Sequence, residues 1–289
     1  MRFGVVEYVE IVEVGPRDGL QNEPRKISVA DKVALIDALS PVGFRRIEAA
    51  SFVSPKWVPQ MAGSAEVMAA IERAPGVRYT ALTPNLRGLE DAIAAQADEV
   101  AVFASASEAF SRANINASIE ESLVRFGTVI EAARAKDLPV RGYVSCVTDC
   151  PYEGPVAPEA VARVSAALFE AGCIEVSLGD TLGRGMPERV DAMLAAVSDV
   201  VPAKQLAGHF HDTSGRALEN VAVALARGLK VFDASVGGLG GCPYAPGAAG
   251  NVATSAVAAY LAAAGYELGL DIARLEAASA LARAMTGER

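Results

Sequence analysis

The sequence has few histidines, few cysteines and no long apolar run. Two histidines, four cysteines and one tryptophan occur among 289 residues. No stretch of about 18 apolar residues is present, so we expect no membrane-spanning helix. The first ten residues, MRFGVVEYVE, show neither the basic start and apolar core of a secretion signal nor an arginine-rich transit peptide. The chain is therefore expected in the cytoplasm.

Positive charge is also scarce. Lys and Arg number 26 against 35 Asp and Glu, which gives a net charge of −9. Nucleic-acid binding needs a basic surface, so we expect no nucleic-acid partner. An anionic small molecule is still compatible with this balance. A bound cation, an arginine or a helix N-terminus attracts it locally, and salt screens distant charges over about 8 Å.

Common binding motifs are missing as well. The four cysteines form no Cys-x-x-Cys pair, so a zinc knuckle is not expected and the thiols should be free. Neither G-K-[ST] nor G-x-G-x-x-G occurs, which leaves no Walker loop and no dinucleotide fingerprint.

Short apolar segments alternate with longer stretches of helical periodicity. Ile119, Leu123 and Phe126 recur at helical spacing, and Ser118 with Glu121 predicts a capping box. The expected strands cover residues 9–14, 45–50, 77–82, 100–104, 140–146, 174–180, 205–210 and 231–236.

This alternation predicts the fold. Strands that alternate with helices are parallel, and eight such units over roughly 250 residues fit a closed barrel. An open sheet is the competing architecture, and it would carry a dinucleotide fingerprint where GPRDGLQNE follows the first strand. We predict a single (β/α)8 TIM barrel domain over 1–289, with 265–289 as a C-terminal helical extension.

Polar residues gather where these strands end, which is where barrel enzymes carry their chemistry. His209 and His211 are two residues apart on a strand, so both imidazoles point to one side and could hold a metal ion. Asp18 and Asn251 could add oxygen ligands, which favours Mg²⁺ or Mn²⁺.

Each candidate also has a plain structural explanation. The histidines could be one core and one exposed side chain, Asp18 could favour the turn before Gly19, and Asn251 could cap a helix.

The same holds for the charged candidates. Arg17 could form a structural ion pair, and Glu48, inside an apolar strand, needs a partner wherever it lies. Asp180 could cap the next helix.

The glycine-rich stretch 237–250 holds Cys242 in its middle. It could be a plain flexible connection. Alternatively, it closes over the mouth of the barrel and brings a thiol suited to proton transfer.

Six segments resemble the hydroxymethylglutaryl-CoA lyase family, and the resemblance spans about Val9 to Leu275. They are VEVGPRDGLQNE, SFVSPKWVPQM, YVSCVTDCPYEG, SLGDT, HFHDT and GGLGGCPYAPGAAGN. The resemblance implies a metal-dependent (β/α)8 barrel, expected to be a homodimer or higher homo-oligomer. It would cleave the acyl-CoA 3-hydroxy-3-methylglutaryl-CoA into acetyl-CoA and acetoacetate.

The resemblance also implies a role for each matching residue. Arg17 would bind the thioester carbonyl oxygen, Cys242 would be the catalytic loop cysteine, and Glu48 and Asp180 would support the site. Either His209 or Asp180 could be the general base. The implied ligands of one Mg²⁺ or Mn²⁺ are Asp18, His209, His211 and Asn251.

Alternative functions are a lyase for a related 3-hydroxyacyl-CoA and a non-catalytic acyl-CoA-binding barrel. A non-catalytic barrel should have lost a ligand or the cysteine, yet every position is filled. Asn22, Lys56 and Asn85 are candidates for CoA contacts, with surface solvation as their structural alternative. Phe210 stands where animal family members often have Cys, and on a strand it faces away from the metal.

Overall fold

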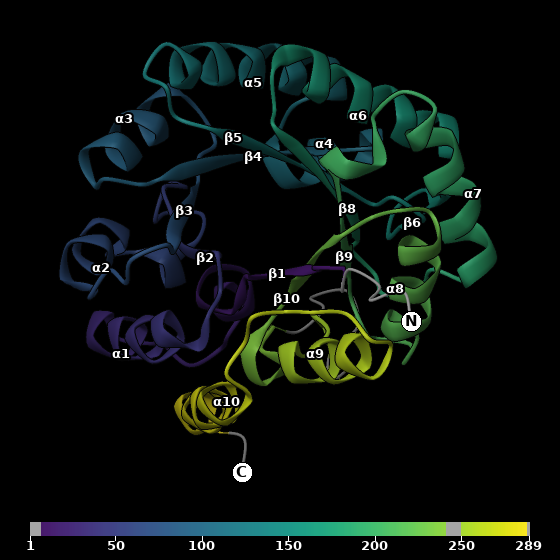
Figure 1. The fold of residues 1–289 in the computed structure, drawn as a ribbon. Coiled ribbons are helices and arrows are strands. Elements are labelled where there is room, and N and C mark those ends of the chain that lie inside the picture. Colours follow the sequence, from purple (N-terminus) through teal and green to yellow (C-terminus); the bar gives the residue numbers. More distant parts are fainter. Residues whose placement is uncertain (1–6, 241–249, 288–289) are drawn as a thin grey trace.

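The chain folds around a closed barrel of parallel strands (Figure 1). The computed structural model describes residues 7–240 and 250–287, and within them eight strands close the barrel in the order β1-β10-β9-β8-β5-β4-β3-β2. The predicted (β/α)8 barrel is confirmed, and each strand begins and ends within the expected range or one residue beyond it. The strands are β1 Glu10–Glu13, β2 Arg46–Ser51, β3 Arg78–Leu82, β4 Glu99–Ser105, β5 Val140–Ser145, β8 Glu175–Asp180, β9 Leu206–Phe210 and β10 Val231–Ala234.

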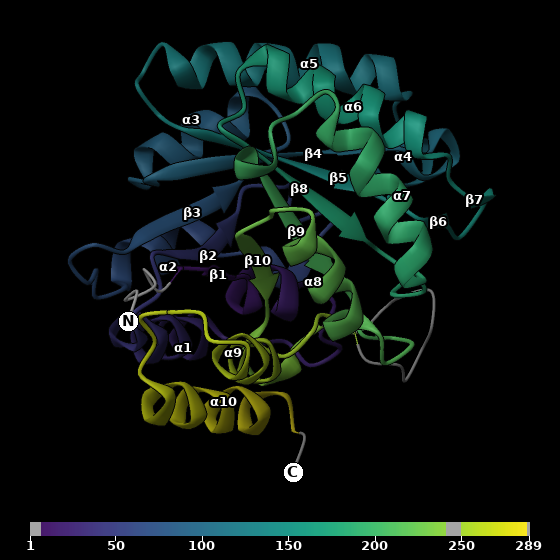
Figure 2. The same ribbon diagram turned by 45° about the vertical axis from the view of Figure 1, so that its right-hand side comes forward.

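Helices form a ring outside the barrel (Figures 1 and 2). A short hairpin, β6 Asp149–Cys150 with β7 Gly154–Pro155, follows β5. The helices are α1 Val29–Leu39, α2 Ser64–Ala70, α3 Leu86–Ala94, α4 Glu108–Ile115, α5 Ile119–Arg134, α6 Pro158–Ala171, α7 Pro187–Ser198, α8 Ala217–Ala226, α9 Thr254–Ala263 and α10 Ile272–Thr286.

Local sequence signals account for several helix boundaries. Ser118 and Glu121 form the predicted capping box of α5, which buries Phe126 and Ile130 on its inner face. The final helix, α10, packs against α1 outside the ring (Figure 2). None of the helices in the described part of the chain has the length and apolar character that a bilayer crossing requires.

The structure does not bear out the two helix caps that were the structural alternatives for Asn251 and Asp180. The residue before α9 is Ala253, and the residue before α7 is Met186. Neither Asn251 nor Asp180 therefore caps a helix, and their side chains are available for other contacts.

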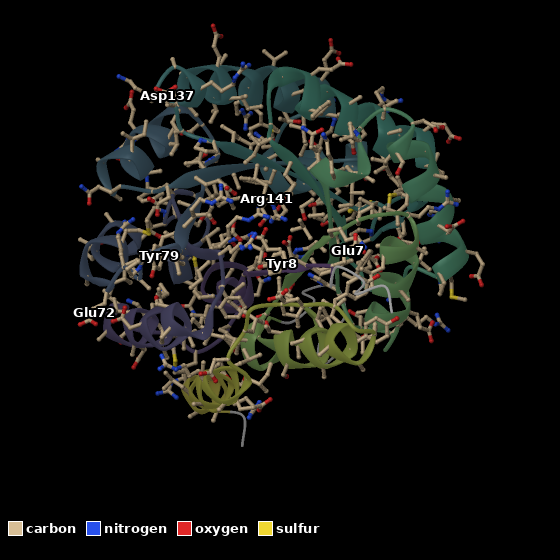
Figure 3. All side chains as sticks on the ribbon, viewed as in Figure 1. Glu7, Tyr8, Glu72, Tyr79, Asp137 and Arg141 are labelled. Carbon is tan, nitrogen blue, oxygen red and sulfur yellow. The ribbon has the colours of Figure 1, made fainter. Side chains whose placement is uncertain are left out.

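The inside of the barrel is charged. Arg141, near the centre of the ring in Figure 3, bonds Asp233 at 2.7 Å and Glu175 at 2.6 Å. Arg46 reaches the same Glu175 at 2.9 Å. Such charges are costly to bury unless each one is paired. This network extends toward the ends of the strands, where the candidate site lies.

Candidate metal centre and active site

The loop after β1 presents Arg17 and Asp18 side by side. Gly15–Gly19 form one wide, π-type helical turn, in which the amides of Asp18 and Gly19 donate to the carbonyl of Val14 at 2.7 and 3.2 Å. Turns of this type are frequent at functional sites. A Cβ at Gly15 would lie 2.7 Å from Glu13 Oε1, so the turn needs glycine there.

Arg17 lies buried between two carboxylates. Its guanidinium is 2.5 Å from Asp18 Oδ1 and 2.6 Å from Glu48 Oε2. Burial opposes the charge, but Glu48 and Asp18 hold the pKa of Arg17 well above its usual value. Among the described residues, Arg17 Nε and Glu48 Oε1 have no hydrogen-bond partner. Within the described part of the chain, the ion pair therefore neutralises both charges without satisfying every polar atom of the two side chains.

His209 and His211 turn their rings to the same side at the end of β9. The ring centres are 5.4 Å apart. Asp18, His209 and His211 each offer a ligand atom, and these atoms all lie within 4.8 Å of one another. The structure therefore brings together three of the four residues expected around one cation.

Asn251, the fourth expected ligand, reaches the same place. Its segment runs beside the end of β9, where the amide of Val252 donates to the carbonyl of Phe210 at 3.3 Å. The side-chain nitrogen of Asn251 donates to Asp18 Oδ2 at 2.8 Å. A half turn of this amide exchanges nitrogen for oxygen and would offer an oxygen ligand instead.

The protonation states suit a divalent cation. Burial opposes ionisation of Asp18, but Arg17 and the two imidazoles lower its pKa to about 2. Burial, together with His209, lowers the pKa of His211 to about 4, so that ring is neutral at pH 7. A carboxylate, imidazoles and an amide oxygen form a mixed donor set that Mg²⁺ and Mn²⁺ accept. The residues present fit such an ion.

Asp233, which is not among the site residues predicted from the sequence, holds His209 in place. Its Oδ2 lies 3.0 Å from His209 Nδ1 and accepts a hydrogen bond from Ser177 at 2.7 Å. A carboxylate on one ring nitrogen directs the other toward a metal. Burial lowers the pKa of His209, but Asp233 raises it above its usual value. An Asp inside the apolar segment VFDASV was a usable signal, because a buried carboxylate needs a partner.

Asp180 lies apart from this cluster. Its two oxygens accept hydrogen bonds from Thr148 Oγ1 at 2.9 Å and from the amide of Gly185 at 2.8 Å. Ser177, on the same strand, faces Asp233 inside the barrel. Side chains alternate along a strand, so Asp180 faces the opposite side. These contacts support the loop after β8.

The remaining candidates are less informative. Cys242 lies outside the described residues. Asn85 is the N-cap of α3 and accepts the amide of Gly88 at 3.0 Å, so its side chain has a structural role. Asn22 and Lys56 are exposed.

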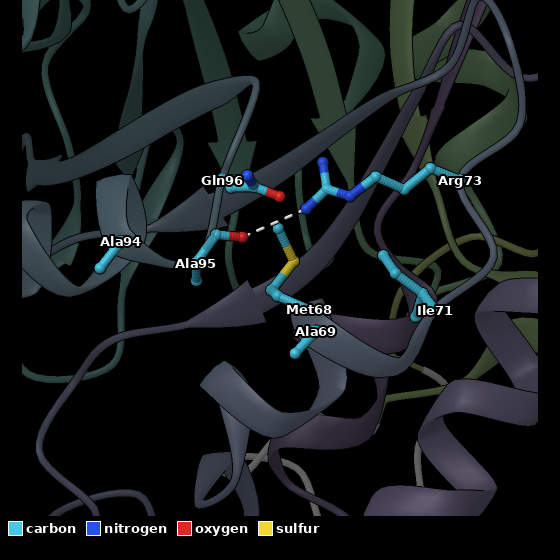
Figure 4. A pocket seen from close by; sticks show the side chains of 7 residues that line it. All are labelled: Met68, Ala69, Ile71, Arg73, Ala94, Ala95 and Gln96. Carbon is cyan, nitrogen blue, oxygen red and sulfur yellow. Dashed lines mark hydrogen bonds between the residues drawn. The ribbon is translucent and has the colours of Figure 1, made fainter.

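A cavity of about 350 Å³ lies between α2 and α3, away from all these residues (Figure 4). Arg73 is the one charged group among the described residues that line it, and it already donates to the carbonyl of Ala95 at 3.2 Å and to Asp98 at 3.2 Å. It offers no convergent polar groups and is not the candidate site.

Comparison with known proteins agrees with this geometry. The profile of the HMGL-like family matches residues 8–282. A 3-hydroxy-3-isohexenylglutaryl-CoA/hydroxy-methylglutaryl-CoA lyase of Pseudomonas aeruginosa is 57% identical over 91% of this chain and 88% of its own.

Solved structures give the same result. The HMG-CoA lyase of Brucella melitensis superposes with a TM-score of 0.96 at 62% identity, over 97% of this chain and 99% of its own. An HMG-CoA lyase of Acinetobacter baumannii, in complex with coenzyme A and 3-methylmalate, has a TM-score of 0.91 at 36% identity, over 97% and 92%. The chain therefore belongs to the HMGL-like family.

Proposed function

We propose that the chain cleaves 3-hydroxy-3-methylglutaryl-CoA to acetyl-CoA and acetoacetate with the help of one Mg²⁺ or Mn²⁺. The observation that carries this proposal is the convergence of Asp18, His209 and His211 beside the Arg17–Glu48 pair. Family membership supports it, as does the relative solved with coenzyme A and a small dicarboxylic acid.

Asp18, His209, His211 and Asn251 would hold the cation. When bound, such an ion supplies positive charge that polarises substrate oxygens and makes a hydroxyl more acidic. Asp233 fixes the ring of His209 and Arg17 neutralises part of the charge of Asp18, so the donors are organised before the ion binds.

The cleavage begins with loss of the proton from the 3-hydroxyl. His209 was one candidate for this base, but one of its ring nitrogens is 3.0 Å from Asp233 and the other, facing Asp18, would bind the cation. Asp180 has both oxygens occupied by Thr148 and Gly185. Glu48 is the better candidate. Burial raises its pKa, Arg17 counteracts this, and its Oε1 is without a partner among the described residues.

The C2–C3 bond then breaks, its electrons pass to the thioester as an enolate, and the C3 fragment leaves as acetoacetate. Arg17, a buried cation whose Nε has no partner in the described part of the chain, would stabilise the enolate oxygen. Protonation of the enolate carbon gives acetyl-CoA. We assign this proton to Cys242 because of its place in the glycine-rich stretch.

Substrate range is a second part of the proposal. The relative from Pseudomonas aeruginosa is named for an isohexenyl as well as a methyl substrate. We expect this chain to accept the methyl compound, and a longer 3-alkyl substrate is the alternative.

A coupled assay tests both. Purified protein, first stripped with EDTA and then given Mg²⁺, is mixed with each acyl-CoA. Acetyl-CoA and the 3-oxo acid product, which is acetoacetate for the methyl substrate, are measured separately. Equal amounts of both products from the methyl substrate support the proposal. Binding of the acyl-CoA without any product would indicate a non-catalytic barrel.

A further inference from the structure

Glu13, the last residue of β1, is fully buried, and its carboxylate forms no ion pair with any described residue. It accepts three hydrogen bonds instead. Oε1 accepts from the amides of Gly15 and Val236, both at 2.8 Å, and Oε2 accepts from the hydroxyl of Thr254 at 2.7 Å. One side chain thus joins three segments that are far apart in the sequence.

Two of these segments carry expected ligands of the cation. Gly15 opens the turn that presents Asp18 three residues later. Thr254 opens α9 and follows Asn251 by three residues. Asp18 and Asn251 are therefore each three residues away from a residue that is hydrogen-bonded to the Glu13 carboxylate.

The third segment completes the arrangement. Val236 follows β10. Its neighbour Ser235 forms two backbone hydrogen bonds with residues 252–254, which come directly after Asn251. The amide of Ser235 donates to the carbonyl of Val252, and the amide of Thr254 donates to the carbonyl of Ser235, both at 3.0 Å. Residues 252–254 are therefore hydrogen-bonded to the end of β10. Glu13 connects both of these segments to the turn that carries Asp18.

We propose that Glu13 is a positioning residue that sets the distance between Asp18 and Asn251 and so determines how tightly the site binds its cation. The proposal rests on the proposed function, because it assumes that these residues share an ion. Glu13 does not touch the ion itself; it acts through the two backbone segments and Thr254.

The chemistry of the position supports this role. A carboxylate buried without a cationic partner is unfavourable, and burial raises the pKa of Glu13 to about 7 although its three hydrogen bonds lower it. A side chain needed only to fill space could be apolar. A carboxylate has two oxygens with several acceptor positions, which lets it bind three donors from different directions at once.

Binding of Mn²⁺ to the intact protein, measured by calorimetry without substrate, tests the proposal. Glu13→Ala should weaken Mn²⁺ binding by about tenfold or more, the range seen when the residues supporting metal ligands are lost. Glu13→Gln should recover most of the affinity, because its amide oxygen can still accept both backbone bonds. Glu99→Ala is the matched control. Glu99 is equally buried but pairs with arginines at the opposite end of the barrel, so this variant should keep the wild-type affinity.

A milder variant covers the case in which Glu13→Ala does not fold. Thr254→Val removes only the hydroxyl that bonds Glu13 and should weaken Mn²⁺ binding several-fold. Ser279→Ala removes a buried hydroxyl whose one bond to a described residue is to the carbonyl of Leu275 in α10, and it should leave Mn²⁺ binding unchanged. Wild-type affinity in Thr254→Val and in folded Glu13→Ala would overturn the positioning role alone. Absence of Mn²⁺ binding to the wild type would overturn the cation site and this role together.

Discussion

Removing the charge of Arg17 affects two roles at once, since this residue pairs with Glu48 and is also assigned to the enolate. The single variant Arg17→Gln leaves Glu48 buried, 1% exposed, without its cation. Breaking a buried ion pair in this way costs about 3–5 kcal/mol of unfolding free energy. A loss of activity in this variant could therefore come from damage to the fold.

The double variant Arg17→Gln/Glu48→Gln restores the charge balance. Two neutral amides can bond each other where the ion pair was, so most of the lost stability should return. Activity should not return. Loss of a group that stabilises an oxyanion costs on the order of a hundredfold to a thousandfold in turnover, and the proposed base, Glu48, is gone as well.

Three proteins are needed for this comparison: the single variant, the double variant and Glu48→Gln. Urea unfolding measures stability, and the acetoacetate assay with added Mg²⁺ measures kcat. We expect the double variant to approach wild-type stability with turnover at least a hundredfold reduced. Recovery of turnover together with stability would show that Arg17 and Glu48 are structural only, and the mechanism would be wrong.

Three further perturbations follow from the structure. Asp233→Asn should weaken Mn²⁺ binding about tenfold to a hundredfold, measured by calorimetry, because His209 loses the carboxylate that orients it; unchanged affinity would contradict this. Burial raises the pKa of Glu13 from 4.5 to about 7. Between these two pH values the carboxyl stays protonated in the native state but is ionised in the unfolded chain. Glu13 therefore lowers stability as the pH rises from 4.5 to about 7. Over this range the unfolding free energy of wild type minus that of Glu13→Gln should fall by on the order of 3 kcal/mol. A flat difference from urea unfolding would show that Glu13 titrates normally. Cys242→Ser should keep Mn²⁺ and substrate binding but lose most of kcat, and wild-type turnover would make the thiol dispensable.

Much of the fold could be predicted from the sequence because its signals are local. Each strand is a short apolar segment bounded by turn residues, and strict alternation with helices leaves few topologies. The capping box at Ser118 and Glu121 placed the start of α5 correctly. The turn around Arg17 and Asp18 and the spacing of His209 and His211 are local too, which is why these residues could be identified.

The supporting network could not be predicted, because it depends on contacts between distant strands. Arg141 and Asp233 are 92 residues apart, and Glu13 and Thr254 are 241 apart. Sequence spacing says nothing about which layer of the barrel each side chain reaches. Asp180 lies at the end of a strand, as expected. Because side chains alternate between the two faces of a strand, however, it points away from the metal cluster and toward Thr148.

The central claim is that donors from three separate parts of the chain share one cation, and a Mn²⁺ titration of wild type and His211→Ala tests it most directly. His211 is the donor to which we assign no other task, so its loss should affect the ion alone. We predict one Mn²⁺ per wild-type chain and binding at least tenfold weaker in the variant, with the fold intact by circular dichroism. Equal affinity in the two proteins would contradict the account.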